Sequence, residues 1–194
     1  VYKRQIEKKK FLLENCNKII FVSQYLKKRF FKDLKIKHKN NVEIIANAIH
    51  KIKKFPVKKK IIIFSGKLNK SKGYHVFGKS IVNILEKNSD WKALVIGNEP
   101  REKHYFTHKN LKILNWLEHN KLLKFFEKSS ISVVNPTWQE PFGRTAMESA
   151  SRGCAVITSV SGGLQETFNN NLILKKNNSN YLIKKIQFLS LIHI

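Results

Sequence analysis

The sequence predicts an α/β fold: a Rossmann-like, doubly wound domain around a parallel sheet, preceded by a remnant of an N-terminal domain. Short apolar runs alternate with amphipathic segments along most of the 194 residues, which is typical of β-α-β units. Residues 51–59 are rich in lysine, contain Pro56 and show no periodicity, so they are typical of a linker. A chain of this length has room for one domain with its own core and a part of another.

The residues before the linker, 6–50, show the pattern of the closing elements of a domain. A helix, a strand, a helix and a strand are expected at residues 6–16, 19–22, 24–31 and 42–45. Ser23 is a suitable N-cap for the second of these helices. These elements do not fit into the series that follows the linker, so they indicate a separate unit.

The residues after the linker, 60–188, are expected to form the Rossmann-like domain. Six apolar runs are strand candidates, at residues 61–64, 93–96, 111–114, 131–134, 155–158 and 172–174. Helical patterns lie between and after them, at residues 74–86, 120–126, 144–152, 164–168 and 177–188. Strands that alternate with helices in this way predict a parallel sheet with helices on both faces.

The two ends of the chain resemble translated sequencing adapter. Residues 1–5 read Val-Tyr-Lys-Arg-Gln and residues 189–194 read Leu-Ser-Leu-Ile-His-Ile. Back-translated, the two strings are nearly reverse complements, as expected for the two strands of one transposase end. The alternative is a polar N-terminus and an apolar C-terminal strand. We expect both segments to be scars outside the fold of a fragment cut from a longer protein.

The charge of the chain, +25, would ordinarily suggest a nucleic-acid or membrane partner. However, only five of the 38 basic residues are Arg, and the abundant Lys, Asn and Ile all have A/T-rich codons. The charge is also spread along the chain rather than gathered beside aromatic residues, so we expect no nucleic-acid partner. Weak contact with an anionic membrane stays open. Cys16 and Cys154 have no metal-binding spacing and are expected to be core residues in a reducing cytoplasm.

Three loops follow strands of the predicted sheet, and parallel sheets bind ligands at this edge. The first, residues 65–73, places Gly66 and Gly73 around two cations, Lys67 and Lys72, that could reach one polyanion. It is neither a Walker A loop nor a G-x-G-x-x-G turn, and the alternative is a solvated lysine-rich loop. Another loop, at residues 161–166, has a glycine pair that could open a helix toward a phosphate.

The loop after the 131–134 strand is more specific. Two prolines stiffen it, and Gly143 permits a close backbone approach where the next helix begins. Glu140 precedes this helix and Glu148 lies inside it. Carboxylates so placed could accept hydrogen bonds from separated hydroxyls of one polyhydroxylated ligand. The alternative is an exposed loop acid and a helix-surface acid.

With these loops, residues 16–168 resemble glycosyltransferase family 4, the "glycosyl transferases group 1". Glu140 and Glu148 have the spacing of the family's E-x7-E motif, and residues 66–73 match its G-[RK]-L-x3-K-G loop. Further similar segments are Phe21-Val22-Ser23, Ile45-Ala46-Asn47, Ile96-Gly97, Asn115-Trp116-Leu117, Glu140-Pro141-Phe142-Gly143, Gly153 to Val156, and Gly162-Gly163. The resemblance implies the C-terminal, donor-binding domain of a retaining GT-B enzyme.

The resemblance also implies roles for single residues. Lys67 and Lys72 would grip the diphosphate of the donor, and Glu140 would hold its sugar. Backbone at Gly66, Phe142, Gly143 and Arg144 would approach the sugar and the phosphates, and Glu148 would hold the ribose. Asn98, Trp116 and Leu117 would face the base. The family more often has Arg at the position of Lys67. A lysine there keeps the positive charge and lacks the bidentate hydrogen-bonding fork of Arg. Asn115 and Gln165 stand where the family commonly has Gly and Pro. Because of Asn115, the resemblance does not define the base pocket.

The expected activity is that of a hexosyltransferase that moves a sugar from a nucleoside diphosphate to an acceptor hydroxyl with retention. We expect no cofactor and no metal, since there is no D-x-D pair and side-chain cations can stabilise the leaving diphosphate. The expected role is bacterial lipopolysaccharide or surface polysaccharide synthesis on a glycan or lipid-linked acceptor. The expected place is the cytoplasm, with peripheral contact at the inner face of the membrane left open. The alternatives are a GT-B phosphorylase or synthase of storage or osmolyte sugars, and a basic nucleotide- or nucleic-acid-binding module without catalysis.

Overall fold

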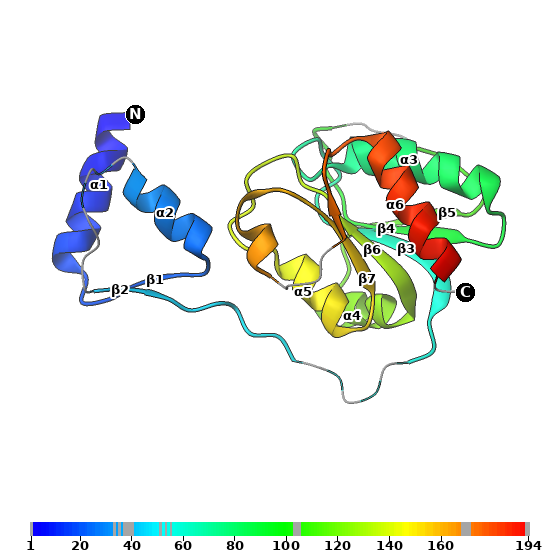
Figure 1. Cartoon of the computed structure of the whole chain (residues 1–194), viewed down its shortest axis with the longest axis horizontal. Helices are drawn as coiled ribbons and strands as arrows, with labels where there is room; N and C mark the ends of the chain where they lie inside the picture. The colour runs from blue at the N-terminus through cyan, green and yellow to red at the C-terminus, as the bar shows by residue number, and fades with distance from the viewer. Residues whose placement is uncertain are drawn as a thin grey trace. The chain divides into compact units, whose positions relative to one another are not determined.

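The structure is a computed structural model that describes residues 2–32, 34, 36, 41–50, 52, 54, 56–102, 106–167 and 172–192. The chain forms two compact units, residues 1–48 and 49–194 (Figure 1). Of the predicted linker, residues 51, 53 and 55 lie outside the described residues, and the first strand of the second unit already begins at Lys59.

The first unit has the predicted order of helices and strands. Its elements are α1 (Tyr2–Asn15), β1 (Ile19–Phe21), α2 (Gln24–Lys32) and β2 (Val42–Ile44), and the two strands pair in parallel. Ser23 is the expected N-cap, because its Oγ accepts a hydrogen bond from the Leu26 N–H at 3.1 Å. A small core holds the unit together, made of Leu13, Phe21, Phe31, Leu34 and Val42. The first helix begins four residues earlier than predicted, because residues 2–5 include the helix-forming Lys3, Arg4 and Gln5.

The second unit contains the predicted six-stranded parallel sheet. Its strands are β3 (Lys59–Ser65), β4 (Lys92–Ile96), β5 (Leu111–Leu114), β6 (Ser129–Val134), β7 (Ala155–Ser159) and β8 (Leu172–Leu174). The strand order is β5-β4-β3-β6-β7-β8, and every pair is parallel. The order reverses between β3 and β6. In a doubly wound sheet the loops at this switch point form the ligand-binding crevice.

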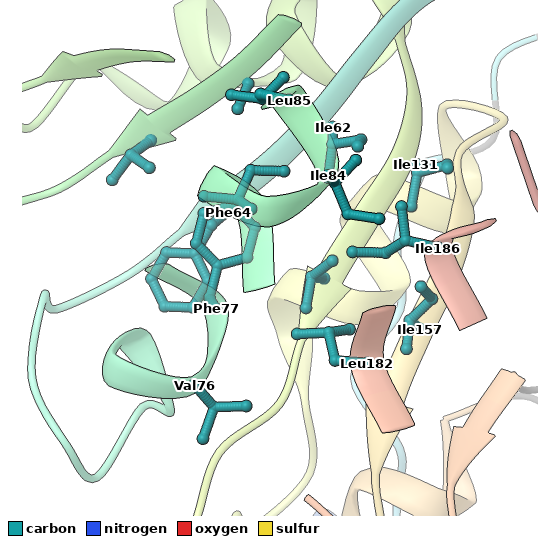
Figure 2. Packing of buried hydrophobic residues seen from close by; sticks show 14 of the residues in the cluster. Ile62, Phe64, Val76, Phe77, Ile84, Leu85, Ile131, Ile157, Leu182 and Ile186 are labelled. Carbon is teal, nitrogen blue, oxygen red and sulfur yellow. The ribbon is translucent and has the colours of Figure 1, made fainter. Parts of the chain in front are cut away.

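Helices cover both faces of the sheet. They are α3 (Tyr74–Lys87), α4 (His119–Lys128), α5 (Arg144–Ser151), the 3-10 helix η1 (Gly162–Glu166) and α6 (Ser179–Ile192). Successive side chains of a strand point to opposite faces of the sheet. Ile62 and Phe64 of β3 therefore join the core under α3 and α6, two helices that lie side by side. Ile63 packs on the opposite face with α4, α5 and η1. Figure 2 shows the first of these clusters, where Phe77 of α3 approaches Phe64 and Leu182 and Ile186 of α6 reach Ile157.

Two expectations at the C-terminal end are corrected. Residues 189–194 were expected to lie outside the fold, but α6 continues to Ile192, and Leu189, 2% exposed, packs in the same cluster as Leu182 and Ile186. The spacing of these three residues places them on one face of a helix, which explains the continuation. The origin of both end segments in an adapter stays a prediction. The helix expected at 164–168 is the shorter η1, and Phe168 lies outside the described residues.

None of the described helices combines the length and the apolar character needed to cross a bilayer.

Candidate functional site

The loops that follow β3 and β6 lie side by side at the carboxyl edge of the sheet. We call residues 66–73 the lysine loop and residues 135–143 the acidic loop. The Thr137 N–H donates to the Ser71 carbonyl at 2.9 Å, and the Thr137 Oγ1 donates to the Lys70 carbonyl at 2.8 Å. Asn135, which is fully buried, donates from Nδ2 to the Gly73 carbonyl at 3.2 Å. These bonds join the two loops, so their functional side chains keep a defined spacing.

Gly73 allows the two loops to approach this closely. It ends the lysine loop with a φ of +79°, and a Cβ added there would lie 2.0 Å from the Asn135 carbonyl oxygen. Within the loop, the Asn69 Oδ1 accepts hydrogen bonds from the Lys72 N–H at 3.0 Å and from the Ser71 Oγ at 2.9 Å. The turn is therefore held by its own side chains, and Lys72 extends from a fixed backbone.

The structure brings together Lys72 and Glu140, as predicted. The Lys72 Nζ donates to the Glu140 Oε2 at 2.8 Å. Both residues line a cavity of about 110 Å³, with Gly66 from the lysine loop and Gly143, Arg144 and Thr145 from the start of α5. A helix N-terminus has unpaired N–H groups and partial positive charge, so a cation, a carboxylate and an anion-binding helix end share this small cavity.

Lys67 does not line this cavity, in contrast to Lys72. Its charge instead acts on Glu99, in the loop after β4. Glu99 is buried, and Arg101 donates to its two oxygens at 2.7 and 3.0 Å. This pair of hydrogen bonds lowers the pKa of Glu99 to about 2. Both lysines were predicted to bind one diphosphate. The geometry supports this for Lys72, which lines the cavity with Glu140, and not for Lys67.

The loop after β4, which we call the β4 loop, contacts the lysine loop at two points. The Glu102 Oε2 accepts a hydrogen bond from the Lys70 N–H at 2.8 Å. Gly97 passes so close to Gly66 that an added Cβ would lie 1.9 Å from the Gly66 carbonyl oxygen. Asn98, which was predicted to face the base, follows Gly97 directly and is exposed.

Glu148 is not a helix-surface acid, so this alternative is wrong. It is 7% exposed, and its Oε1 accepts hydrogen bonds from the Arg144 Nη2 at 3.1 Å and Nε at 3.3 Å. The His119 Nε2 lies 3.1 Å from the same oxygen. His119 begins α4, just beyond the predicted base-facing Trp116 and Leu117. Leu117 is partly buried against the core and Trp116 is 56% exposed, so the turn after β5 is anchored on one side and open on the other.

Gly163, from the glycine pair predicted as a possible phosphate cradle, contacts the acidic loop. The Gly163 N–H donates to the Glu140 carbonyl at 2.7 Å. The hydroxyl groups of Ser159 and Ser161 both donate to the Pro136 carbonyl at 2.8 Å. The third loop therefore uses its polar groups to hold the acidic loop in place.

Phe142 and Gly143 complete the backbone around the helix start. Phe142 is 5% exposed and fixes the acidic loop in the fold. Gly143 has a φ of +120°, and a Cβ added there would lie 2.4 Å from the Leu164 Cδ1. The glycine therefore permits close packing of Leu164 of η1 against the start of α5, and the approach of its backbone to a ligand stays a prediction.

Two residues of the site were missed by the sequence analysis, His119 and Trp138. The Trp138 Nε1–H donates to the Glu140 Oε2 at 2.8 Å, and the Lys72 Nζ lies 4.8 Å from the centroid of the Trp138 ring. The available signal was weak: an aromatic residue two positions before the acid, and a histidine at a helix start.

Comparison with known proteins was consistent with this arrangement. The family model "Glycosyl transferases group 1" matches residues 45–191. Spore coat protein SA of Bacillus subtilis (strain 168) is 25% identical over 138 residues, which is 64% of this chain and 35% of that protein. An uncharacterized glycosyltransferase of Methanocaldococcus jannaschii is 31% identical over 193 residues, which is 91% of this chain and 50% of that protein. The chain thus spans about half the length of these relatives or less.

Among solved structures, the crystal structure of Anabaena HepE in complex with UDP-glucose is similar in fold. The TM-score is 0.77 at 14% sequence identity, and the match covers 96% of this chain and 57% of HepE. The match extends across both units of the chain.

Proposed function

Because the chain belongs to the glycosyl transferases group 1 family, we propose that its second unit is the donor site of an enzyme that transfers a sugar from a nucleoside diphosphate to an acceptor hydroxyl. One observation carries the proposal: Lys72, Glu140 and the N-terminus of α5 line the same cavity at the switch point of the sheet. A diphosphate needs cations and N–H donors, and a sugar needs carboxylate acceptors, so this combination suits a nucleotide sugar.

Each group in the cavity has a distinct part in this proposal. The Lys72 ammonium and the α5 N–H groups near Gly143 and Arg144 bind the diphosphate. Glu140 accepts hydrogen bonds from the sugar hydroxyls. Glu148 holds the ribose, and its orientation is set by Arg144 and His119. Lys67 raises the positive potential of the lysine loop from outside the cavity, and Asn98 and Trp116 form the exposed rim toward the base.

The chemistry follows from where charge develops. When the bond between the anomeric carbon and the phosphate breaks, negative charge grows on the diphosphate. The α5 N-terminus faces that position, and Lys72 turns toward it from Glu140 when the donor binds, so both stabilise the transition state more than the bound donor. The acceptor oxygen then forms the new bond at the anomeric carbon, and its proton passes to the released diphosphate, which is the base formed in the same step. We infer retention of configuration and a hexose donor from the family resemblance.

We further propose surface polysaccharide or lipopolysaccharide synthesis as the wider role, with a glycan or lipid-linked acceptor. We place the enzyme in the cytoplasm as part of the same proposal, and the cationic charge of the chain would favour its contact with an anionic membrane surface. The Methanocaldococcus jannaschii relative supports a transferase by name, and the names of the relatives and of the HepE complex described above give no acceptor.

Nucleotide binding by the unmodified chain tests the donor site. UDP, ADP and GDP are titrated into the chain by calorimetry, and the tightest of them is titrated into Lys72→Met. Loss of one charge-assisted interaction should weaken binding by about tenfold or more. Lys92→Met is the matched control, because Lys92 is an exposed lysine at the start of β4, on the opposite edge of the sheet.

An unchanged dissociation constant in Lys72→Met would contradict the proposed site. Failure of all three nucleotides to bind the unmodified chain would contradict the proposed function as a whole. A tight complex with glucose 1-phosphate in place of any nucleotide would instead favour a sugar phosphorylase.

A further inference from the structure

Trp138 is an exposed aromatic residue whose polar group is committed to the acidic side chain of the site. It is 43% exposed and belongs to none of the hydrophobic core clusters of the described residues. Its indole N–H donates to the Glu140 Oε2 at 2.8 Å. A large exposed indole contributes little to the core of the unit, so its position beside Glu140 calls for another explanation.

The Glu140 carboxylate is held on one side only. Its Oε2 receives two hydrogen bonds, from Lys72 and from Trp138, and the backbone carbonyl of Glu140 receives a third, from Gly163. Within the described part of the chain, no donor reaches the Oε1 atom. The carboxylate is thus oriented through one oxygen and presents the other, which is the arrangement that a sugar hydroxyl requires.

The two anchors on Oε2 differ in what they do when a donor binds. Under the proposed function, the Lys72 ammonium turns toward the diphosphate, whose charge exceeds that of one carboxylate. The indole N–H of Trp138 is a neutral donor and has no such competing partner. The Trp138 ring also lies 4.8 Å from the ammonium, so a cation–π contact supports Lys72 during that turn.

We propose that Trp138 is a positioning residue that keeps Glu140 directed at the donor sugar while Lys72 binds the diphosphate. The inference rests on the proposed function, since it assigns a sugar to Glu140 and a diphosphate to Lys72. Trp138 acts through Glu140 and Lys72, and its side chain is not required to touch the donor.

The backbone of Trp138 does not depend on its side chain. The Trp138 N–H donates to the Ser71 carbonyl at 3.3 Å, and the neighbouring Thr137 holds the loop through two further bonds. Trp138→Phe therefore keeps the loop and an aromatic ring, and removes the N–H donor together with the pyrrole ring that carries it. Gln139→Ala is the matched control, because Gln139 is an exposed neighbour in the same loop with no part in the site.

The test separates the contribution of the sugar from that of the nucleotide. UDP, ADP and GDP and their glucose conjugates are titrated into the unmodified chain, Trp138→Phe and Gln139→Ala. For the tightest nucleotide, the ratio of the dissociation constant of the diphosphate to that of its glucose conjugate reports the sugar contact. In Trp138→Phe this ratio should fall about threefold to tenfold, as expected when one hydrogen bond of ordinary strength that orients Glu140 is lost, while the diphosphate alone binds within about twofold of the original. Gln139→Ala should leave both constants unchanged.

A double-mutant cycle with Glu140→Ala adds a second criterion. If Trp138 acts through Glu140, Trp138→Phe should have no further effect on the ratio once Glu140 is removed. The indole N–H resonances of Trp91 and Trp116 in a ¹H–¹⁵N spectrum show that each variant is folded.

Each of the following results would overturn the inference. An unchanged ratio in Trp138→Phe would exclude a role toward the sugar, and an equal loss for the diphosphate and its conjugate would indicate a general structural role. Equal affinity of the unmodified chain for a diphosphate and its glucose conjugate would remove the sugar contact of Glu140, and with it the inference. If no nucleotide binds the unmodified chain, the proposed function itself fails and the inference falls with it.

Discussion

At the scale of single residues, the two glutamates of the site are held in different ways, and this predicts different functions for them. Glu140 faces the cavity with one anchored oxygen, whereas Glu148 is buried in α5 with Arg144 and His119 on its Oε1. A ribose does not change during transfer, so a residue that holds it contributes mainly to binding.

Glu148→Gln should weaken binding of the preferred nucleoside diphosphate by about 1.5–3 kcal/mol, the range for a hydrogen bond to a charged group. If the lost contact is with the ribose, discrimination against the 2′-deoxy nucleotide should diminish with it. Calorimetric titration of the ribo- and deoxyribonucleotides into both proteins measures this. Equal losses for the two nucleotides would mean that Glu148 acts on the fold of the site and not on the ribose hydroxyl.

Arg101 gives the β4 loop a predicted pH dependence. Its hydrogen bonds lower the pKa of Glu99 in the folded protein to about 2, from an ordinary value of 4.5. A carboxyl whose folded pKa is depressed stabilises the fold above its unfolded pKa, and this stabilisation is lost as the pH falls toward 2. Arg101→Gln should therefore lower the melting temperature at pH 7, and the difference from the original should close between pH 4.5 and 2. The effect is expected to be small, since the Arg101 side chain is 78% exposed. A constant difference over this pH range would assign the effect of Arg101 to something other than Glu99.

At the scale of elements, the site depends on how the loops of the parallel sheet are fastened to each other. The lysine loop and the acidic loop share hydrogen bonds through Thr137 and Asn135, the β4 loop joins through Glu102, and η1 joins through Gly163. Loops on a rigid scaffold place functional groups with little reorganisation, which is what an electrostatic site requires.

Gly73→Ala tests this fastening. The residue has a φ of +79°, and the added Cβ would lie 2.0 Å from the Asn135 carbonyl oxygen, so the two loops would have to separate. The strained backbone conformation and the steric contact both destabilise the variant. We therefore expect a loss of at least about 2 kcal/mol in the free energy of unfolding, together with weaker nucleotide binding. Gly66→Ala is the comparison, because its φ is +150° but an added Cβ meets no heavy atom within 4 Å. Denaturant unfolding of both variants measures the difference. Equal losses would mean that backbone conformation alone, and not the contact with Asn135, sets the requirement for glycine.

At the scale of the whole molecule, the two units of the chain differ in the size of their sheets and of their apolar cores. The larger unit has apolar clusters on both faces of a six-stranded sheet, whereas the smaller one has two short strands and a core of a few residues. The family match spans residues 45–191, so it covers the larger unit and only the end of the smaller one.

Much of the fold was predictable from the sequence because its signals are local. Strands such as Leu111–Leu114 and Leu172–Leu174 coincide with the predicted runs, and the helix starts at Tyr74 and Arg144 follow Gly73 and Gly143 as expected. Alternation of apolar runs and helices also predicts the parallel sheet, because a strand must return through a helix to pair in parallel. The E-x7-E spacing likewise lies within one loop and the helix that follows it.

The partners that functional side chains find far away in the sequence were decided by the tertiary structure alone. Lys72 and Glu140 are 68 residues apart in sequence, and His119 and Glu148 are 29 apart, so no local pattern relates them. The separation of Lys67 from the cavity, the use of the Gly163 N–H by the backbone, and the burial of Leu189 likewise depend on which elements pack together. The sequence determined which elements form and which loops meet at one edge of the sheet, because periodicity and turn residues act over a few positions. The choice of contacts across those loops required the packed sheet, which brings distant residues within hydrogen-bonding distance.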